Sequence, residues 1–65
     1  MATIRLETLR RASEIIGDDK ILAGMLGVNE RLLAWWKSQG VSIPEGVFFM
    51  CVDIVVSDAV HQKSH

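Results

Sequence analysis

The sequence contains very little of several residue types, and each scarcity excludes a class of protein. Its 65 residues include one cysteine, one proline and five glycines. A single thiol cannot build the disulfide framework of small secreted domains, and so little proline and glycine excludes a collagen-like chain. A basic excess is also lacking, because 7 lysines and arginines stand against 8 aspartates and glutamates, for a net charge of −1. The charge balance therefore leaves no basic footprint of the kind that nucleic-acid-binding domains carry.

Long apolar runs are lacking as well. The longest run covers residues 47–52 and ends at Asp53, far short of the roughly 20 residues that a membrane-spanning helix needs. Charged residues alternate with apolar ones near the N-terminus, so we expect no secretory signal. We interpret Cys51, which lies in the most apolar stretch, as a small buried hydrophobe rather than a nucleophile. One thiol fits a reducing compartment, and we expect a cytoplasmic protein.

Apolar residues are abundant, at 49% of the chain. This fraction excludes a disordered chain, because disordered segments are poor in apolar residues. A domain of this length folds alone only marginally. The apolar excess therefore either fills an unusually rich core or is shared with a second subunit.

The spacing of apolar residues predicts an all-α fold, because no stretch alternates apolar and polar residues for long enough to indicate a strand. We expect one compact four-helix domain over residues 1–60, followed by a flexible tail over residues 61–65. The predicted helices span residues 3–16, 19–26, 30–39 and 43–60. On the first of them, one stripe at helical spacing consists of Leu6, Leu9, Ser13 and Ile16, with Ala12 and Ile15.

Glycines and capping residues mark the expected helix ends. Glycine readily adopts the left-handed conformation that terminates helices, and it occurs here as Gly17, Gly27 and Gly40. Asp18 and Asn29 are expected N-caps. Ser42 and Glu45 have the spacing of a capping box at the start of the last helix, where Pro44 is tolerated.

Residues 19–38 form the most informative segment. Two short helices joined by a three-residue turn must cross steeply if both are to bury their apolar faces. Ala23 supplies a small residue at the crossing, Gly27 allows the turn, and Val28 fills the inside of the angle. The apolar positions that close the core are Leu22, Leu26, Leu33 and Trp36. This pattern is typical of a helix-turn-helix motif.

With these residues the chain resembles the Cro and phage-repressor type of helix-turn-helix domain, over about residues 5–58. The resemblance implies a lambda-repressor-like fold and a phage-like or prophage-like transcription regulator. It also implies that the helix over residues 30–39 lies in the major groove of double-stranded DNA. The implied base-reading residues are Asn29, Glu30, Arg31, Ala34 and Trp35, and the implied backbone contacts are Lys20, Lys37 and Ser38.

The chemistry of these side chains fits the implied roles in part. Arg31 can read guanine through two hydrogen bonds, Glu30 can accept from cytosine, and Ala34 can contact a thymine methyl group. Asp18 and Asp19, however, stand where the family places donors to phosphate. With the cap Asp18 included, the two central helices carry three basic residues, Lys20, Arg31 and Lys37, against three acidic ones, Asp18, Asp19 and Glu30. A rival hypothesis follows, in which the helix-turn-helix is a scaffold repurposed for protein–protein interaction or dimerisation, with little DNA affinity.

The last predicted helix is apolar on two faces. Its core face contains Val47, Phe48, Cys51, Ile54 and Val55. A second apolar set consists of Phe49, Val52, Val56 and Val60. A helix that is apolar over most of its circumference must be buried on more than one side. We therefore expect a homodimer through this second set.

No catalytic or cofactor-binding constellation is present. We find no nucleophile paired with a histidine for catalysis and no glycine-rich phosphate loop, so we expect neither an enzyme nor a bound cofactor. His61 and His65 have a spacing that can bind metal on a helix. No third ligand lies near them in the sequence, and we expect no metal site.

Overall fold

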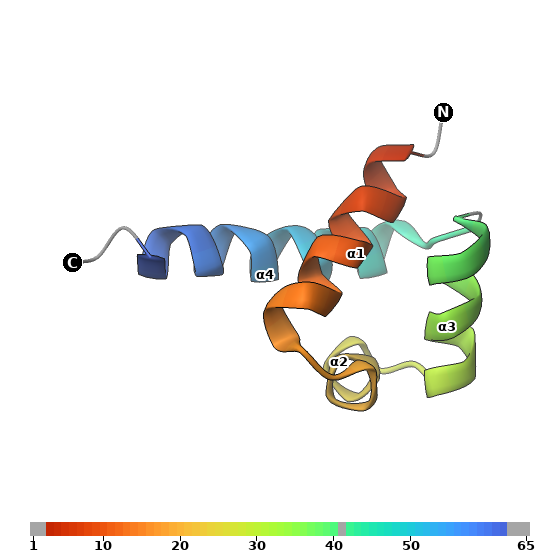
Figure 1. The fold of residues 1–65 in the computed structure, drawn as a ribbon. Helices are drawn as coiled ribbons and strands as arrows, with labels where there is room; N and C mark the ends of the chain where they lie inside the picture. The colour runs from red at the N-terminus through yellow and green to blue at the C-terminus, as the bar shows by residue number, and fades with distance from the viewer. Residues whose placement is uncertain (1–2, 41, 63–65) are drawn as a thin grey trace.

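A computed structural model describes residues 3–40 and 42–62 of the chain, and Figure 1 shows its arrangement. The four helices are α1 (Thr3–Ile16), α2 (Asp19–Leu26), α3 (Glu30–Gln39) and α4 (Glu45–Gln62). No strand occurs within these described residues. The predicted all-α, four-helix fold is therefore confirmed.

Caps delimit the two central helices as expected. The Asp18 carboxylate accepts a hydrogen bond of 2.8 Å from the Lys20 backbone N–H at the start of α2. Asn29 does the same for the Leu32 N–H at the start of α3, at 2.9 Å. Gly27 and Gly40 end these helices with φ angles of 73° and 70°, a conformation that glycine adopts without steric cost.

The start of α4 differs from the prediction. The Pro44 carbonyl accepts the first helical hydrogen bond, from the Phe48 N–H at 3.0 Å. Glu45 is then the first residue of the helix, whereas a capping box needs a glutamate three residues after the cap. Ser42 has a φ of 60°, so the chain turns sharply there before burying Ile43, which is 5% exposed. The predicted start at residue 43 and the predicted capping box were therefore wrong.

The end of α4 differs too. The helix continues through His61 to Gln62, so these two residues do not belong to a flexible tail. No glycine or proline follows Gly46 in the sequence, and nothing interrupts the helical hydrogen bonds before this point. The rest of the predicted tail, residues 63–65, lies outside the described residues.

One hydrophobic core joins the helices. α2 packs against α3, while α4 packs chiefly against α1. Figure 1 shows that α4 passes behind α1 and that its C-terminal half extends beyond the other three helices. The buried apolar residues are Leu9, Ala12, Leu22, Ala23, Leu26, Leu33, Trp36, Ile43, Val47 and Cys51. This core holds α3 firmly at the edge of the molecule.

Candidate nucleic-acid interface

The turn between α2 and α3 fixes the relation of the two helices. The Val28 N–H donates to the Ala23 carbonyl at 3.0 Å, and the Gly27 N–H donates to the Gly24 carbonyl at 3.3 Å. These bonds satisfy carbonyl groups at the end of α2. α2 is seen end-on in Figure 1 while α3 runs in the plane of the picture, so the two helices cross steeply. Ala23 is 3% exposed, as a small residue at the crossing should be.

The outer face of α3 carries the predicted base-reading residues. Side chains on this face are all exposed: Glu30, Arg31, Ala34, Trp35 and Ser38. Asn29 is exposed as well, although its side-chain oxygen is engaged as the N-cap. Adjacent tryptophans point to opposite sides, since Trp36 is 3% exposed in the core and Trp35 is 47% exposed. The exposed indole of Trp35 is therefore free to contact a partner.

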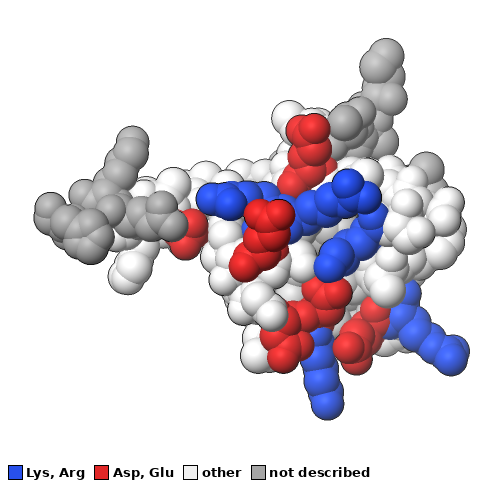
Figure 2. Space-filling model, viewed as in Figure 1, with Lys and Arg blue, Asp and Glu red and all other residues white. Residues whose placement is uncertain are grey.

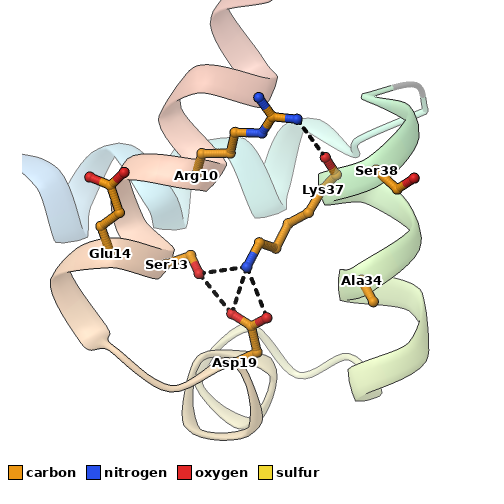
Figure 3. A pocket seen from close by; sticks show the side chains of 7 residues that line it. All are labelled: Arg10, Ser13, Glu14, Asp19, Ala34, Lys37 and Ser38. Carbon is orange, nitrogen blue, oxygen red and sulfur yellow. Dashed lines mark hydrogen bonds and ion pairs between the residues drawn. The ribbon is translucent and has the colours of Figure 1, made fainter.

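The predicted backbone contacts have different surroundings. Lys20 lies exposed in the first turn of α2, and Ser38 lies exposed near the end of α3. Lys37 instead points inward, and its ammonium nitrogen lies 2.8 Å from Asp19 Oδ2 and 2.9 Å from Ser13 Oγ. Its phosphate role, expected from the sequence, would therefore compete with an internal ion pair. Figure 3 shows this arrangement.

The ion pair belongs to a cluster that joins three helices. Ser13 of α1 donates its hydroxyl proton to Asp19 Oδ1 of α2 at 2.7 Å and accepts from Lys37 of α3. The hydrogen bond from Lys37, followed by that from Ser13, lowers the pKa of the Asp19 carboxyl below its ordinary value, because both bonds favour the charged form. Asp19 is thus neutralised by Lys37 and repels a phosphate less than the sequence suggested.

An open hollow lies over this cluster, at the junction of the first three helices. Its volume is about 460 Å³, and its lining residues are Arg10, Ser13, Glu14, Asp19, Ala34, Lys37 and Ser38. Arg10 of α1 donates from Nη2 to the Lys37 carbonyl oxygen at 3.0 Å (Figure 3). Arg10 is exposed, so it adds a positive charge beside the C-terminal part of α3. Sequence spacing could not place this α1 side chain next to α3.

The charge around α2 and α3 remains balanced. With Asp19 and Lys37 paired, the other charges of α2, α3 and their caps are Lys20 and Arg31 against Asp18 and Glu30, and the hollow adds Arg10 against Glu14. Acidic and basic side chains are interleaved over the face seen in Figure 2, where no wide basic surface appears. Contacts of lysine and arginine with phosphates supply the sequence-independent part of DNA affinity. Any DNA affinity of this face would therefore depend on few phosphate contacts.

The outer face of α4 is the other exposed surface of interest. Phe49 is 59% exposed, Val56 52% and Val60 60%, while Val52 is half-buried. Met50 adds to the exposed apolar side chains of this helix at 47%. Of the predicted core face, Val47 and Cys51 are buried and Ile54 packs against the core, while Phe48 and Val55 are half-buried without belonging to it. A large apolar surface thus lies open along α4.

The remaining sequence expectations concern cysteine, metals and membranes. Cys51 is 1% exposed, and burial raises the pKa of its thiol, which agrees with a role as a small core residue. Within residues 3–40 and 42–62, no three metal-ligating side chains cluster. His65 lies outside that part of the chain. None of the described helices combines the length and the apolar character needed to cross a membrane.

Comparison of the chain with protein families, with curated proteins and with solved structures gives no match. The resemblance to Cro-type domains therefore stands on the residues of α2, the turn and α3. Function is accordingly inferred from the geometry of these elements and from the exposed faces of α3 and α4.

Proposed function

We propose that this chain is a sequence-specific DNA-binding transcription regulator of the phage or prophage Cro type, acting as a homodimer with α3 in the major groove. One observation carries the proposal. α3 is anchored on its inner side by Leu33 and Trp36, at 0% and 3% exposure, while its outer face is fully open. A rigid helix with an open polar face is what groove reading requires.

The side chains on α3 suit distinct roles in such a complex. Arg31 would donate two hydrogen bonds to a guanine edge, and Glu30 would accept one from a cytosine amino group. Trp35 would pack along the groove wall. Lys20 and Ser38, together with Arg10, would contact phosphates and so position α3 without reading bases.

In this proposal Lys37 has a positioning role. Its ammonium bonds to Ser13 and Asp19, so it links α3 to the two preceding helices instead of reaching outward. Stable orientation of α3 relative to α2 matters, because the first helix of such a motif crosses the DNA backbone while the second enters the groove.

The proposal is tested by titrating labelled DNA with the protein at low salt, first with mixed genomic fragments and then with fragments enriched by binding. Arg31→Ala should weaken binding to the enriched site by roughly tenfold to a hundredfold and relax its sequence preference. Arg11→Ala is the matched control, because Arg11 is an exposed arginine of α1 paired with Glu14 at 3.4 Å. Absence of binding at low salt, or equal effects of the two substitutions, would refute the proposal.

A second candidate function is supported by the balanced charge around α3 and by the 47% exposure of Trp35. In this alternative the fold is a scaffold for protein–protein interaction, and α4 with Trp35 binds another protein. Exposed tryptophan is a common anchor of protein interfaces. A pull-down that recovers one stoichiometric partner, and that Val56→Asp blocks, would favour this function over DNA binding.

A further inference from the structure

We infer that the outer face of α4 is covered by α4 of a second copy of this chain, running antiparallel, with Val52 opposite the partner's Val56 and Phe49 opposite the partner's Ala59. This inference deepens the homodimer of the proposed function by giving its geometry. It is tested in the absence of DNA. The dimer geometry can therefore fail while DNA binding holds, and DNA binding can fail while the dimer geometry holds.

The first argument is the spacing of the exposed residues. Phe49, Val52, Val56 and Ala59 follow one another at intervals of three, four and three residues. These are the intervals of the two apolar positions of a coiled-coil heptad. Phe49, Val56 and Ala59 are exposed and Val52 is half-buried, so the stripe lies beside the core face and forms a seam of its own. Hereafter these four residues are the α4 seam.

The second argument is the symmetry of the α4 seam. Its spacing reads the same in both directions, so an antiparallel copy meets it in register. A two-fold axis between the helices then places the large Phe49 side chain opposite the small side chain of the partner's Ala59. The two valines pair at the centre. Such a self-complementary patch is what a two-fold interface requires, whereas a parallel pair would place Phe49 against the partner's Phe49.

The third argument is charge. Glu45 precedes Phe49 by four residues and continues the line of the seam at the N-terminal end of α4. An antiparallel pair places the two Glu45 carboxylates at opposite ends of the interface, and it sets the two helix dipoles in opposition. A parallel pair would place Glu45 beside the partner's Glu45, and like charges repel.

The fourth argument concerns what else could cover the seam. The C-terminal half of α4 extends beyond α1, α2 and α3 (Figure 1), so these helices leave that half of the seam uncovered. In the N-terminal half, Phe49 is 59% exposed. The four seam residues are uncharged, and the two aspartates between Phe49 and Ala59, Asp53 and Asp58, lie off the seam at helical spacing. The seam therefore suits an apolar counterpart of the same kind. Exposed apolar surface of this extent marks an interaction site in small soluble domains, and oligomerisation is a common way to stabilise a short chain.

Sedimentation or light scattering over a range of protein concentrations tests whether a second copy of the chain covers the α4 seam. The unmodified chain should be a dimer, and Val56→Asp should shift it to a monomer with its helical circular dichroism intact, because Val56 is 52% exposed and outside the core. Ser57→Asp is the matched control, since it introduces the same side chain at the next position, which is exposed and off the seam. It should leave the dimer unchanged.

A chain that stays monomeric at its highest soluble concentration would overturn the inference. Equal effects of Val56→Asp and Ser57→Asp on the oligomeric state would overturn it as well. A monomer that instead binds a different protein through Val56 would show that another partner occupies the seam.

Disulfide trapping tests the orientation, in a Cys51→Ala background that removes the native thiol. Val52→Cys and Val56→Cys chains, when mixed and oxidised, should form a cross-linked heterodimer, while each alone should link poorly. In the antiparallel register the two copies of one position are offset by four residues, about 6 Å along the axis. Combined with the sideways separation of two helices whose axes lie about 8–10 Å apart, this offset takes their Cα atoms beyond the roughly 7 Å that a disulfide spans. Efficient linking of each single variant to itself would overturn the antiparallel arrangement.

Discussion

The α2–α3 pair and α4 differ in how their exposed apolar side chains are arranged. In the pair, each helix is capped and buries one face, with Leu22 and Leu33 fully buried. α4 also buries one face, through Val47 and Cys51, but it leaves Phe49 and Val56 more than half exposed. The pair also leaves Ile21, Met25, Leu32 and Trp35 exposed, but these side chains are divided between two helices, whereas the exposed apolar side chains of α4 follow one another along a single helix. The core and the α4 seam are thus separate surfaces on one helix, and they should respond differently to substitution.

The largest expected effect is on stability, and it should differ between the buried positions of the α2–α3 pair and the α4 seam. Leu33→Ala should lower the free energy of unfolding by about 2–5 kcal/mol, because it leaves a cavity in the core. Phe49→Ala, measured in the monomeric Val56→Asp background, should change it by only about 0.5 kcal/mol, as is usual for exposed positions. Urea unfolding followed by circular dichroism measures both. A loss at Phe49 as large as that at Leu33 would mean that the seam is part of the monomer core.

A smaller effect is expected at the glycine that ends α3. A Cβ atom on Gly40 would lie 2.7 Å from a Leu6 methyl carbon, and the φ angle there is 70°. Gly40→Ala should therefore destabilise the fold by about 1–3 kcal/mol through strain and crowding together. Gly17→Ala is the control, since Gly17 has a φ of 81° but nothing within 4 Å of an added Cβ. Thermal unfolding should rank Gly40→Ala as the more damaging, and the reverse order would contradict the close approach of Leu6.

The smallest expected effect concerns the cluster that ties the pair to α1. Since the Lys37 and Ser13 hydrogen bonds lower the pKa of Asp19 from its ordinary value of 3.8, the ionised carboxylate stabilises the fold above that pH. This contribution should be lost as the pH falls through the lowered folded-state pKa. The Asp19 and Lys37 side chains are 37% and 29% exposed, so solvent screening limits the coupling to about 1 kcal/mol or less.

A double-mutant cycle with Asp19→Asn, Lys37→Gln and both together measures this coupling by denaturant unfolding. The coupling should be constant near neutral pH and should shrink below about pH 4, the ordinary range of an aspartate. A coupling that does not change with acid would show that the carboxylate charge plays no part in it.

Much of the fold was predictable because its signals are local. Helix ends at Gly27 and Gly40 and caps at Asp18 and Asn29 follow from backbone preferences that a few neighbouring residues determine. The start of α4 was not predictable in this way. Ser42 and Glu45 match a capping box in sequence, but the left-handed turn at Ser42 and the burial of Ile43 shift the first residue of the helix to Glu45.

The candidate site was predictable in part. The exposed positions of α3 follow from its apolar spacing, so Arg31 and Trp35 were expected to face outward. Lys37 was expected to reach a partner, yet it bonds to Asp19 and Ser13. One signal for this was present, because Ser13 is a polar residue in the buried stripe of α1 and a buried hydroxyl requires a partner. Which residue would supply that partner was not readable from sequence.

The sequence by itself determined the four helices, their apolar faces and the surplus of apolar residues in residues 47–60, because helical periodicity and capping act over a few residues. Only the tertiary structure decided that Arg10 lies beside α3, that Lys37 turns inward to Asp19, and that the C-terminal half of α4 extends beyond its neighbours. These outcomes depend on contacts between residues far apart in the chain. Such contacts arise from packing whole helices together, and no local spacing specifies them.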